Sequence, residues 1–119
     1  MKQTNETLRR WLHINNAWET QGADETNLQF YYDVENGVFA YLYNTLKQAI
    51  RRGDKTITIN AKGFIIDELT QCNATDEVKT AIYNNIMETI QETQEYFIIE
   101  ETGVNVDVDI NNGDVTFTT

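Results

Sequence analysis

The sequence contains no proline and no serine, and it holds a single cysteine, Cys72, and a single histidine, His13. The absence of serine excludes the serine-nucleophile hydrolases, because their chemistry needs a serine hydroxyl beside a base. One cysteine cannot close a disulfide within the chain, and a structural zinc site needs four ligands, mostly cysteine or histidine. Disulfide scaffolds and zinc fingers are therefore excluded as well.

Long hydrophobic runs are also missing. No apolar run approaches the roughly 20 residues that a membrane-spanning helix requires, and residues 1–10 lack the apolar stretch of a signal peptide. The six glycines are isolated from one another and form no phosphate-binding loop. With neither a membrane span nor a signal peptide in the sequence, we expect a cytoplasmic protein with no membrane partner.

Residues able to support catalysis or metal binding are few. His13 lies on a predicted helix and Cys72 at the end of another, so both are expected to be structural. The run from Asp107 to Gly113 superficially resembles a calcium loop, but its glycine is one position late and Thr118 stands where such a loop has glutamate. We therefore expect no enzyme activity, no metal and no cofactor.

The charge of the chain is acidic and unevenly distributed. The 119 residues carry 19 acidic and 9 basic side chains, a formal net charge of -10. Residues 1–63 hold eight Lys/Arg and seven Asp/Glu (net +1), whereas residues 64–119 hold only Lys79 against twelve acids (net -11). Direct nucleic-acid binding is not expected, because it depends on lysine and arginine. Length and an apolar content of 40% predict one domain, residues 1–119.

Apolar residues at three-to-four spacing predict helices in four parts of the chain. Asn36 is the expected cap of the second helix, and Arg51 to Gly53 supply the basic last turn and the glycine that end it. Asn73 or Thr75 is expected to cap the last helix, and Gly103 to stop it. The predicted helices span residues 4–20, 39–50, 63–72 and 75 to about 96.

Two internal segments predict strands. Residues 28–34 alternate apolar and polar side chains as a half-buried strand does, although the same aromatic run could also start a helix. We predict a strand there. Residues 56–60 form a shorter alternating strand that is expected to turn Ile57 and Ile59 inward.

The C-terminal segment predicts a hairpin. Residues 104–110 alternate strictly, and Asn112-Gly113 is a preferred centre for a two-residue turn. With that turn, Ile110 pairs with Val115 and every apolar residue of the hairpin falls on one face. The predicted fold class is α+β, with three to four helices packed on one face of a small antiparallel β-sheet that includes this hairpin.

The acids of the second half gather on two predicted elements. Three glutamates of the last helix stand at i, i+4 and i+7 and so share one face about 10 Å long. Two aspartates share the outer face of the hairpin, and two further glutamates link the elements. The candidate partner-binding residues are Glu88, Glu92, Glu95, Glu100, Glu101, Asp107 and Asp109.

Rows of carboxylates without interspersed cations present negative charge as a nucleic-acid backbone presents phosphates. Complementary charge speeds association with a basic groove and makes it sensitive to salt. This small, acidic, non-catalytic profile resembles, at the level of a class, phage-encoded inhibitors of host defence nucleases, of the anti-CRISPR or anti-restriction type. It also resembles immunity proteins and antitoxins. The resemblance implies a DNA mimic that inhibits a basic nucleic-acid-handling protein, such as a nuclease.

Other interpretations stay open at this point. The acids could serve only to solvate the surface, or form the carboxylate-only site of a small enzyme. The chain could instead be an adaptor subunit that binds through an apolar patch around Tyr31, Tyr41 and Tyr96. Part of the acidic charge could also be neutralised within the molecule by four basic residues, Lys47, Arg51, Arg52 and Lys55.

Overall fold

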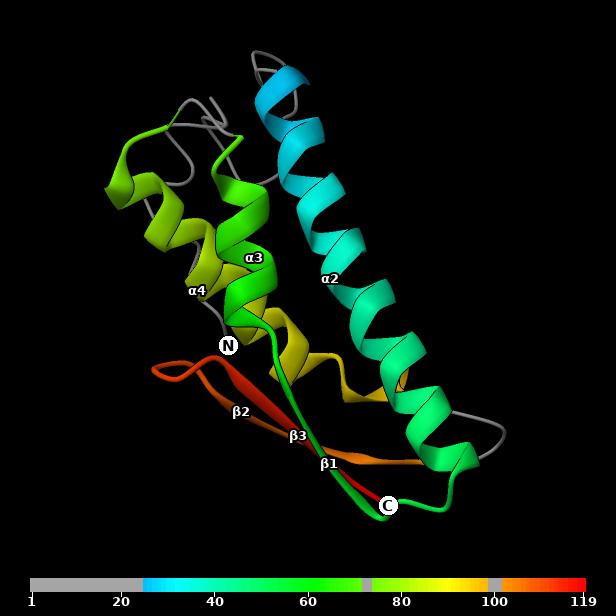
Figure 1. The fold of residues 1–119 in the computed structure, drawn as a ribbon. Coiled ribbons are helices and arrows are strands. Elements are labelled where there is room, and N and C mark those ends of the chain that lie inside the picture. The colour runs from blue at the N-terminus through cyan, green and yellow to red at the C-terminus, as the bar shows by residue number, and fades with distance from the viewer. Residues whose placement is uncertain (1–24, 72–73, 99–101) are drawn as a thin grey trace.

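The structure, a computed structural model, describes residues 25–71, 74–98 and 102–119. These residues form three α-helices, one short 3-10 helix and a three-stranded antiparallel sheet (Figure 1), which confirms the α+β class with a small sheet. The helix expected over residues 4–20, His13 and Cys72 lie outside the described residues. In chain order the elements are α2 (Glu25–Arg51), β1 (Thr56–Asn60), α3 (Lys62–Leu69), α4 (Asp76–Glu92), η1 (Gln94–Tyr96), β2 (Asn105–Asp109) and β3 (Asp114–Thr118).

The long helix α2 includes residues 28–34, so the strand predicted there is wrong. A strand would bury Tyr32 together with Val34, since they stand two positions apart. Instead Tyr32 is 47% exposed, while Tyr31 and Val34, three positions apart, are buried. The segment follows the helical period of the residues after it. Asn36, expected as a cap, is an exposed residue inside the helix.

The end of α2 has the geometry that its sequence predicts. Gly53 has a φ of 88°, in the left-handed region that glycine adopts without strain. Its amide donates to the carbonyl of Ile50 (2.9 Å), and the amide of Asp54 donates to the carbonyl of Ala49 (3.0 Å). This pair of bonds satisfies the last carbonyls of a helix and reverses the chain. The chain then enters β1 directly.

The two later helices confirm their predicted starts more closely than their ends. Thr75 caps α4, since its hydroxyl accepts a hydrogen bond from the amide of Val78 (3.2 Å). However, α4 ends at Glu92, four residues before the predicted end, and the chain continues as η1. Helix α3 also ends early, at Leu69 instead of residue 72. The hydroxyl of Thr70 donates a hydrogen bond to a carbonyl of its last turn (2.6 Å).

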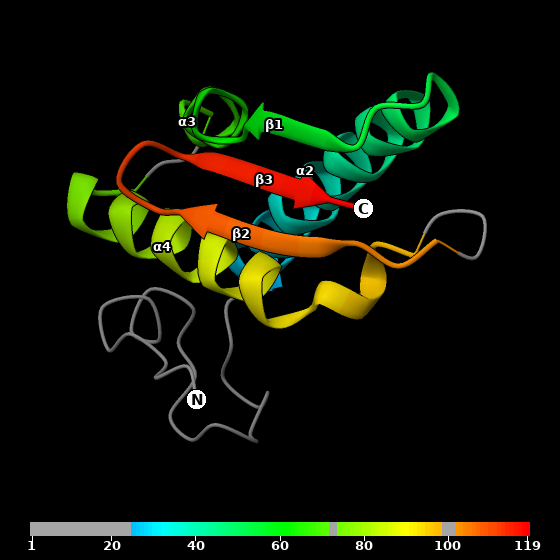
Figure 2. The same cartoon turned by 90° about the horizontal axis from the view of Figure 1, so that it is seen from below.

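The sheet has the strand order β1-β3-β2, with all neighbours antiparallel (Figure 2). The strand predicted over residues 56–60 is therefore present, with Ile59 buried and Ile57 half-buried. It pairs with the C-terminal strand, Thr58 standing opposite Thr116 with their hydroxyls 3.1 Å apart. The last strand of the chain thus lies at the centre of the sheet.

The predicted hairpin register is wrong by two residues. Val108, not Ile110, stands opposite Val115, because four residues separate the strands instead of two. The turn is closed by the amide of Gly113, which donates to the carbonyl of Asp109 (2.7 Å). A shift of two positions leaves each side chain on the face expected for it. Asp107 therefore still points away from the buried side of the sheet.

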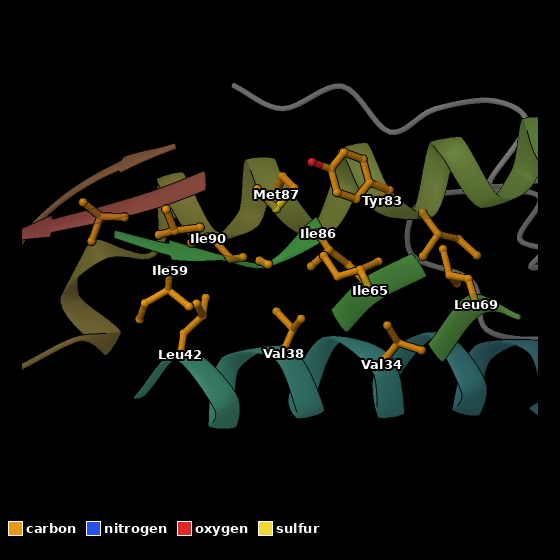
Figure 3. Close-up of a cluster of buried hydrophobic side chains, with 14 of the residues drawn as sticks. Val34, Val38, Leu42, Ile59, Ile65, Leu69, Tyr83, Ile86, Met87 and Ile90 are labelled. Carbon is orange, nitrogen blue, oxygen red and sulfur yellow. The ribbon is translucent and has the colours of Figure 1, made fainter. Parts of the chain in front are cut away.

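The core lies between the helices and the sheet. In Figures 1 and 2 the three helices lie on one side of the sheet, with α4 behind β2 in the second view. Figure 3 shows Val34, Val38 and Leu42 of α2 directed toward side chains of α3 and α4. Phe97, just after η1, is fully buried and contacts both Phe39 of α2 and Phe117 of β3, with ring centroids 5.8 and 4.9 Å apart. This residue joins the helical layer to the sheet.

Replacing Gly113 by alanine should destabilise the protein much more than the same change at Gly53. Both glycines have positive φ, so alanine at either costs about 1–2 kcal/mol of backbone strain. At Gly113 the added methyl would also overlap the Cβ of Lys62, whereas nothing lies within 4 Å of it at Gly53. We expect Gly113→Ala to cost about 3 kcal/mol or more in urea unfolding. Equal losses at the two sites would contradict this close contact.

Candidate functional site

The glutamates of the predicted acidic row are divided between two elements. Glu88 and Glu92 lie one turn apart near the end of α4, whereas Glu95 lies on η1. The single helical face expected for all three is therefore wrong, since α4 ends at Glu92. Glu92 and Glu95 are exposed and Glu88 is half-buried. All three retain contact with solvent.

The aspartates of the hairpin lie on its outer face. Asp107 stands opposite Thr116, and Asp109 stands opposite Asp114. Asp107 and Asp109 are exposed and alternate with the inward-facing Val106 and Val108. Glu100 and Glu101, the remaining members of the predicted set, lie outside the described residues.

Two glutamines bring the acidic parts of α4 and β2 together. The side chain of Gln91 donates to the carbonyl of Val106 and accepts from the amide of Val108, both at 2.9 Å. Gln94 accepts from the amide of Val106 at 3.2 Å. These bonds occupy backbone groups on the outer edge of β2, an edge that would otherwise be open for pairing. They hold the end of α4 along the edge strand.

Acidic side chains therefore lie on both sides of this edge. Glu92 and Glu95 are sequence neighbours of the two bonded glutamines, and Asp107 lies between the two bonded valines. We call the solvent-contacting carboxylates on the two sides of the edge the acidic surface. Its members are Glu88, Glu92, Glu95, Asp107 and Asp109. Gln91 and Gln94 were not predicted, because a glutamine on a helix carries no sequence signal for an edge contact.

The acidic surface has no cation of its own. Residues 80–119 contain no lysine, arginine or histidine. Within residues 25–71, 74–98 and 102–119, no ion pair involves a member of the acidic surface, and the pair between Arg52 and Asp54 (3.0 Å) lies at the end of α2. No described ion pair therefore joins the acidic surface to the cluster of Lys47, Arg51, Arg52 and Lys55.

Asp109 differs from the other members because it also holds the hairpin turn. Its carboxylate accepts from the side-chain amide of Asn112 (2.8 Å) and from the backbone amide of the same residue (3.2 Å). These bonds lower the pKa of Asp109 below its usual value. The opposing Asp114 accepts from the side chain of Asn60 (2.9 Å). Asparagine amides thus offset the repulsion of two carboxylates placed directly opposite each other.

The apolar patch of the adaptor interpretation is not assembled as expected. Tyr31 is 6% exposed, its hydroxyl accepts a hydrogen bond from Asn85, and its burial raises its pKa. Tyr41 stacks on Phe64 of α3, whereas Tyr96 packs against Phe39 and its neighbours on α2. Tyr31 is therefore part of the core, and Tyr41 and Tyr96 contact different rings.

The described residues give little support for a metal site or a membrane span. No group of three or more histidine, cysteine, aspartate or glutamate side chains is arranged there to hold a metal ion. No helix within that part of the chain is long and apolar enough to cross a membrane. No protein-family model, curated protein or solved structure matches the chain.

The hydrogen bonds of Asp109 predict a pH dependence of stability. Because folding lowers the pKa of Asp109, its ionised form favours the folded state above the pKa of the unfolded chain, near 3.8. This contribution is lost as the pH falls through the lower pKa of the folded state. We expect Asp109→Ala to be less stable than the wild type at pH 7, with the difference shrinking below about pH 4 in urea unfolding.

Asp107→Ala is the matched control for this prediction. Asp107 occupies the same face of β2, and no hydrogen bond to another described residue involves its carboxylate. Its removal should leave both the stability at pH 7 and its pH dependence close to those of the wild type. Identical behaviour of the two variants would show that the turn does not depend on Asp109.

Proposed function

We propose that the protein is a non-enzymatic inhibitor that binds a basic, nucleic-acid-handling protein through the acidic surface. The observation that carries the proposal is the pair of glutamines bonded to the edge of β2. They support a fixed arrangement of carboxylates on α4, η1 and β2, in a part of the chain that has no basic residue. A phage-encoded inhibitor of a host defence nuclease, acting in the host cytoplasm, fits this arrangement.

The positions of two glutamates favour a binding role over simple solvation. Glu88 and Glu92 stand in the last turns of α4, which contains no basic residue in its last turn. The C-terminus of a helix carries partial negative charge, so a carboxylate there is unfavourable by about 0.3–1 kcal/mol. Residues that oppose local stability are often kept because they serve function. Solvation alone would be met equally well by lysine.

Carboxylates without internal partners are well suited to a basic groove. An ion pair inside the molecule would neutralise the charge that a partner has to recognise. Members of the acidic surface make no such pair among the described residues, so their field extends into solvent. Fields of this kind accelerate association and are screened at high ionic strength. The proposed complex should therefore form rapidly and weaken as salt is added.

Reversing the charge of Glu88, Glu92 and Glu95 to lysine should abolish partner binding while the fold is retained. We expect the affinity to fall at least about 100-fold, since close charge pairs at interfaces contribute about 1.5 kcal/mol or more each. The same change should raise the thermal stability slightly, because lysine suits the end of α4. Capture of the partner from the native host, followed by mass spectrometry and titration of the purified pair, supplies the measurement.

The control reverses Asp33, Asp67 and Glu68, which lie on α2 and α3. Each triple reversal changes the net charge from -10 to -4, because three residues each change by two units. The control should bind within about threefold of the wild type. Equal losses in the two variants would show that only net charge matters. Retained binding in the first variant would overturn the proposal.

A further inference from the structure

A cavity lies between α3, α4 and the hairpin turn, and its lining includes no member of the acidic surface. Its volume is about 470 Å³, which is within the range of small-molecule sites. The apolar residues of its lining include Ile66 and Leu69 of α3 and Ile110 of the turn. Lys62 and Lys79 lie on its lining as well. We call it the α3–α4 pocket.

The walls of this pocket are held by specific contacts. The hydroxyl of Tyr83 on α4 donates to the carbonyl of Ile110 (2.7 Å), and the ammonium of Lys62 donates to the carbonyl of Asn111 (3.3 Å). The backbone of Gly113 packs directly against Lys62. Figure 3 shows Tyr83 and Leu69 on neighbouring parts of α4 and α3. These contacts tie the hairpin turn to α3 and α4 and so hold the walls of the pocket together.

The lining of the pocket contains more basic than acidic residues, unlike the protein as a whole. Lys79 is the only basic residue between positions 64 and 119, yet it lines the same cavity as Lys62. Asp76 is the one acid of the lining. Within the described part of the chain neither lysine forms an ion pair. The lining therefore holds two lysines against one acid, and neither lysine is held in an ion pair with another described residue.

Apolar surface lies next to these cations. Ile66, which lines the pocket, is 48% exposed, and few other large apolar side chains of the described residues are exposed to this degree. Tyr83 is buried, and the ammonium of Lys62 lies 5.9 Å from the centre of its ring. A ligand with an apolar body and one anionic group would cover the isoleucine and place its charge beside the lysines.

We propose that the α3–α4 pocket binds a small amphipathic organic anion, such as an aromatic carboxylate or sulfonate. The anionic group interacts with Lys62 and Lys79, and the apolar body packs on Ile66, Leu69 and Ile110. Size and lining both support a small molecule, since the cavity is of ligand size and its lining holds two lysines against one acid. This site is independent of the proposed inhibition of a basic partner.

The test uses the fluorescent sulfonate 8-anilinonaphthalene-1-sulfonate as a probe for the full chain. We expect saturable binding with a Kd of about 10–100 µM, as usual ligand efficiencies give for a molecule of this size. Its uncharged analogue N-phenyl-1-naphthylamine should bind at least about tenfold more weakly, because it cannot pair with the lysines. Backbone amide shifts on addition of the sulfonate should be largest at Ile66, Thr80 and Ile110.

A double variant, Lys62→Gln with Lys79→Gln, identifies the groups responsible. It should weaken binding of the sulfonate about tenfold or more, whereas Lys47→Gln with Lys55→Gln, which removes two lysines outside the pocket, should leave it within about twofold. Equal affinities of the first variant and the wild type, or shifts located elsewhere, would overturn the proposal. Tighter binding of hexaglutamate than of the sulfonate would also overturn it, in favour of an acidic peptide as the occupant.

Discussion

The arrangement of the molecule depends on how the edge of β2 is satisfied. An edge strand of a small sheet exposes unpaired amides and carbonyls, which invite pairing with another chain. In this protein, Gln91 of α4 and Gln94 of η1 supply hydrogen bonds that a further strand would supply. The same bonds fix the position of α4 on the sheet. The hydrogen bonds of these two glutamines therefore protect the edge of β2, and they also determine which side chains of α4 remain exposed beside it.

Helix α4 separates two regions of opposite charge. Its first half contributes Lys79 and Tyr83 to the α3–α4 pocket, and its last turns contribute Glu88 and Glu92 to the acidic surface. The hairpin takes part in both regions, since its turn closes the pocket and Asp107 belongs to the acidic surface. The lysine and the glutamates that α4 contributes thus lie in different halves of the helix, whereas the hairpin brings Asp109 next to the pocket residue Ile110.

Local patterns predicted much of this fold, and they failed where two patterns competed or where a side chain altered the backbone. The cap at Thr75 and the end at Gly53 follow from local chemistry and are confirmed. Residues 28–34 fit both a strand and a helix. They form a helix because their buried apolar residues continue the apolar stripe of the rest of α2. The turn gained two residues because Asp109 accepts hydrogen bonds from Asn112, an interaction that Asn-Gly statistics do not include.

The candidate site could be predicted in its composition but not in its assembly. The sequence shows that no cation follows Lys79, and hence where the carboxylates concentrate. Their relation in space needs the contact of Gln91 with β2, which joins residues 15 and 17 positions apart. The α3–α4 pocket was not predicted at all, because it joins Lys62 to Lys79 and to a turn near the end of the chain.

Amide hydrogen exchange at Val108 tests the central claim, that α4 and β2 form one fixed surface, most directly. In the wild type this outward-facing amide should be protected, because it donates to Gln91. In Gln91→Ala its exchange should become at least about tenfold faster, while the amides of β3 keep their rates. An unprotected Val108 amide in the wild type would contradict the account, because α4 and its glutamates would then not be held along the edge of β2.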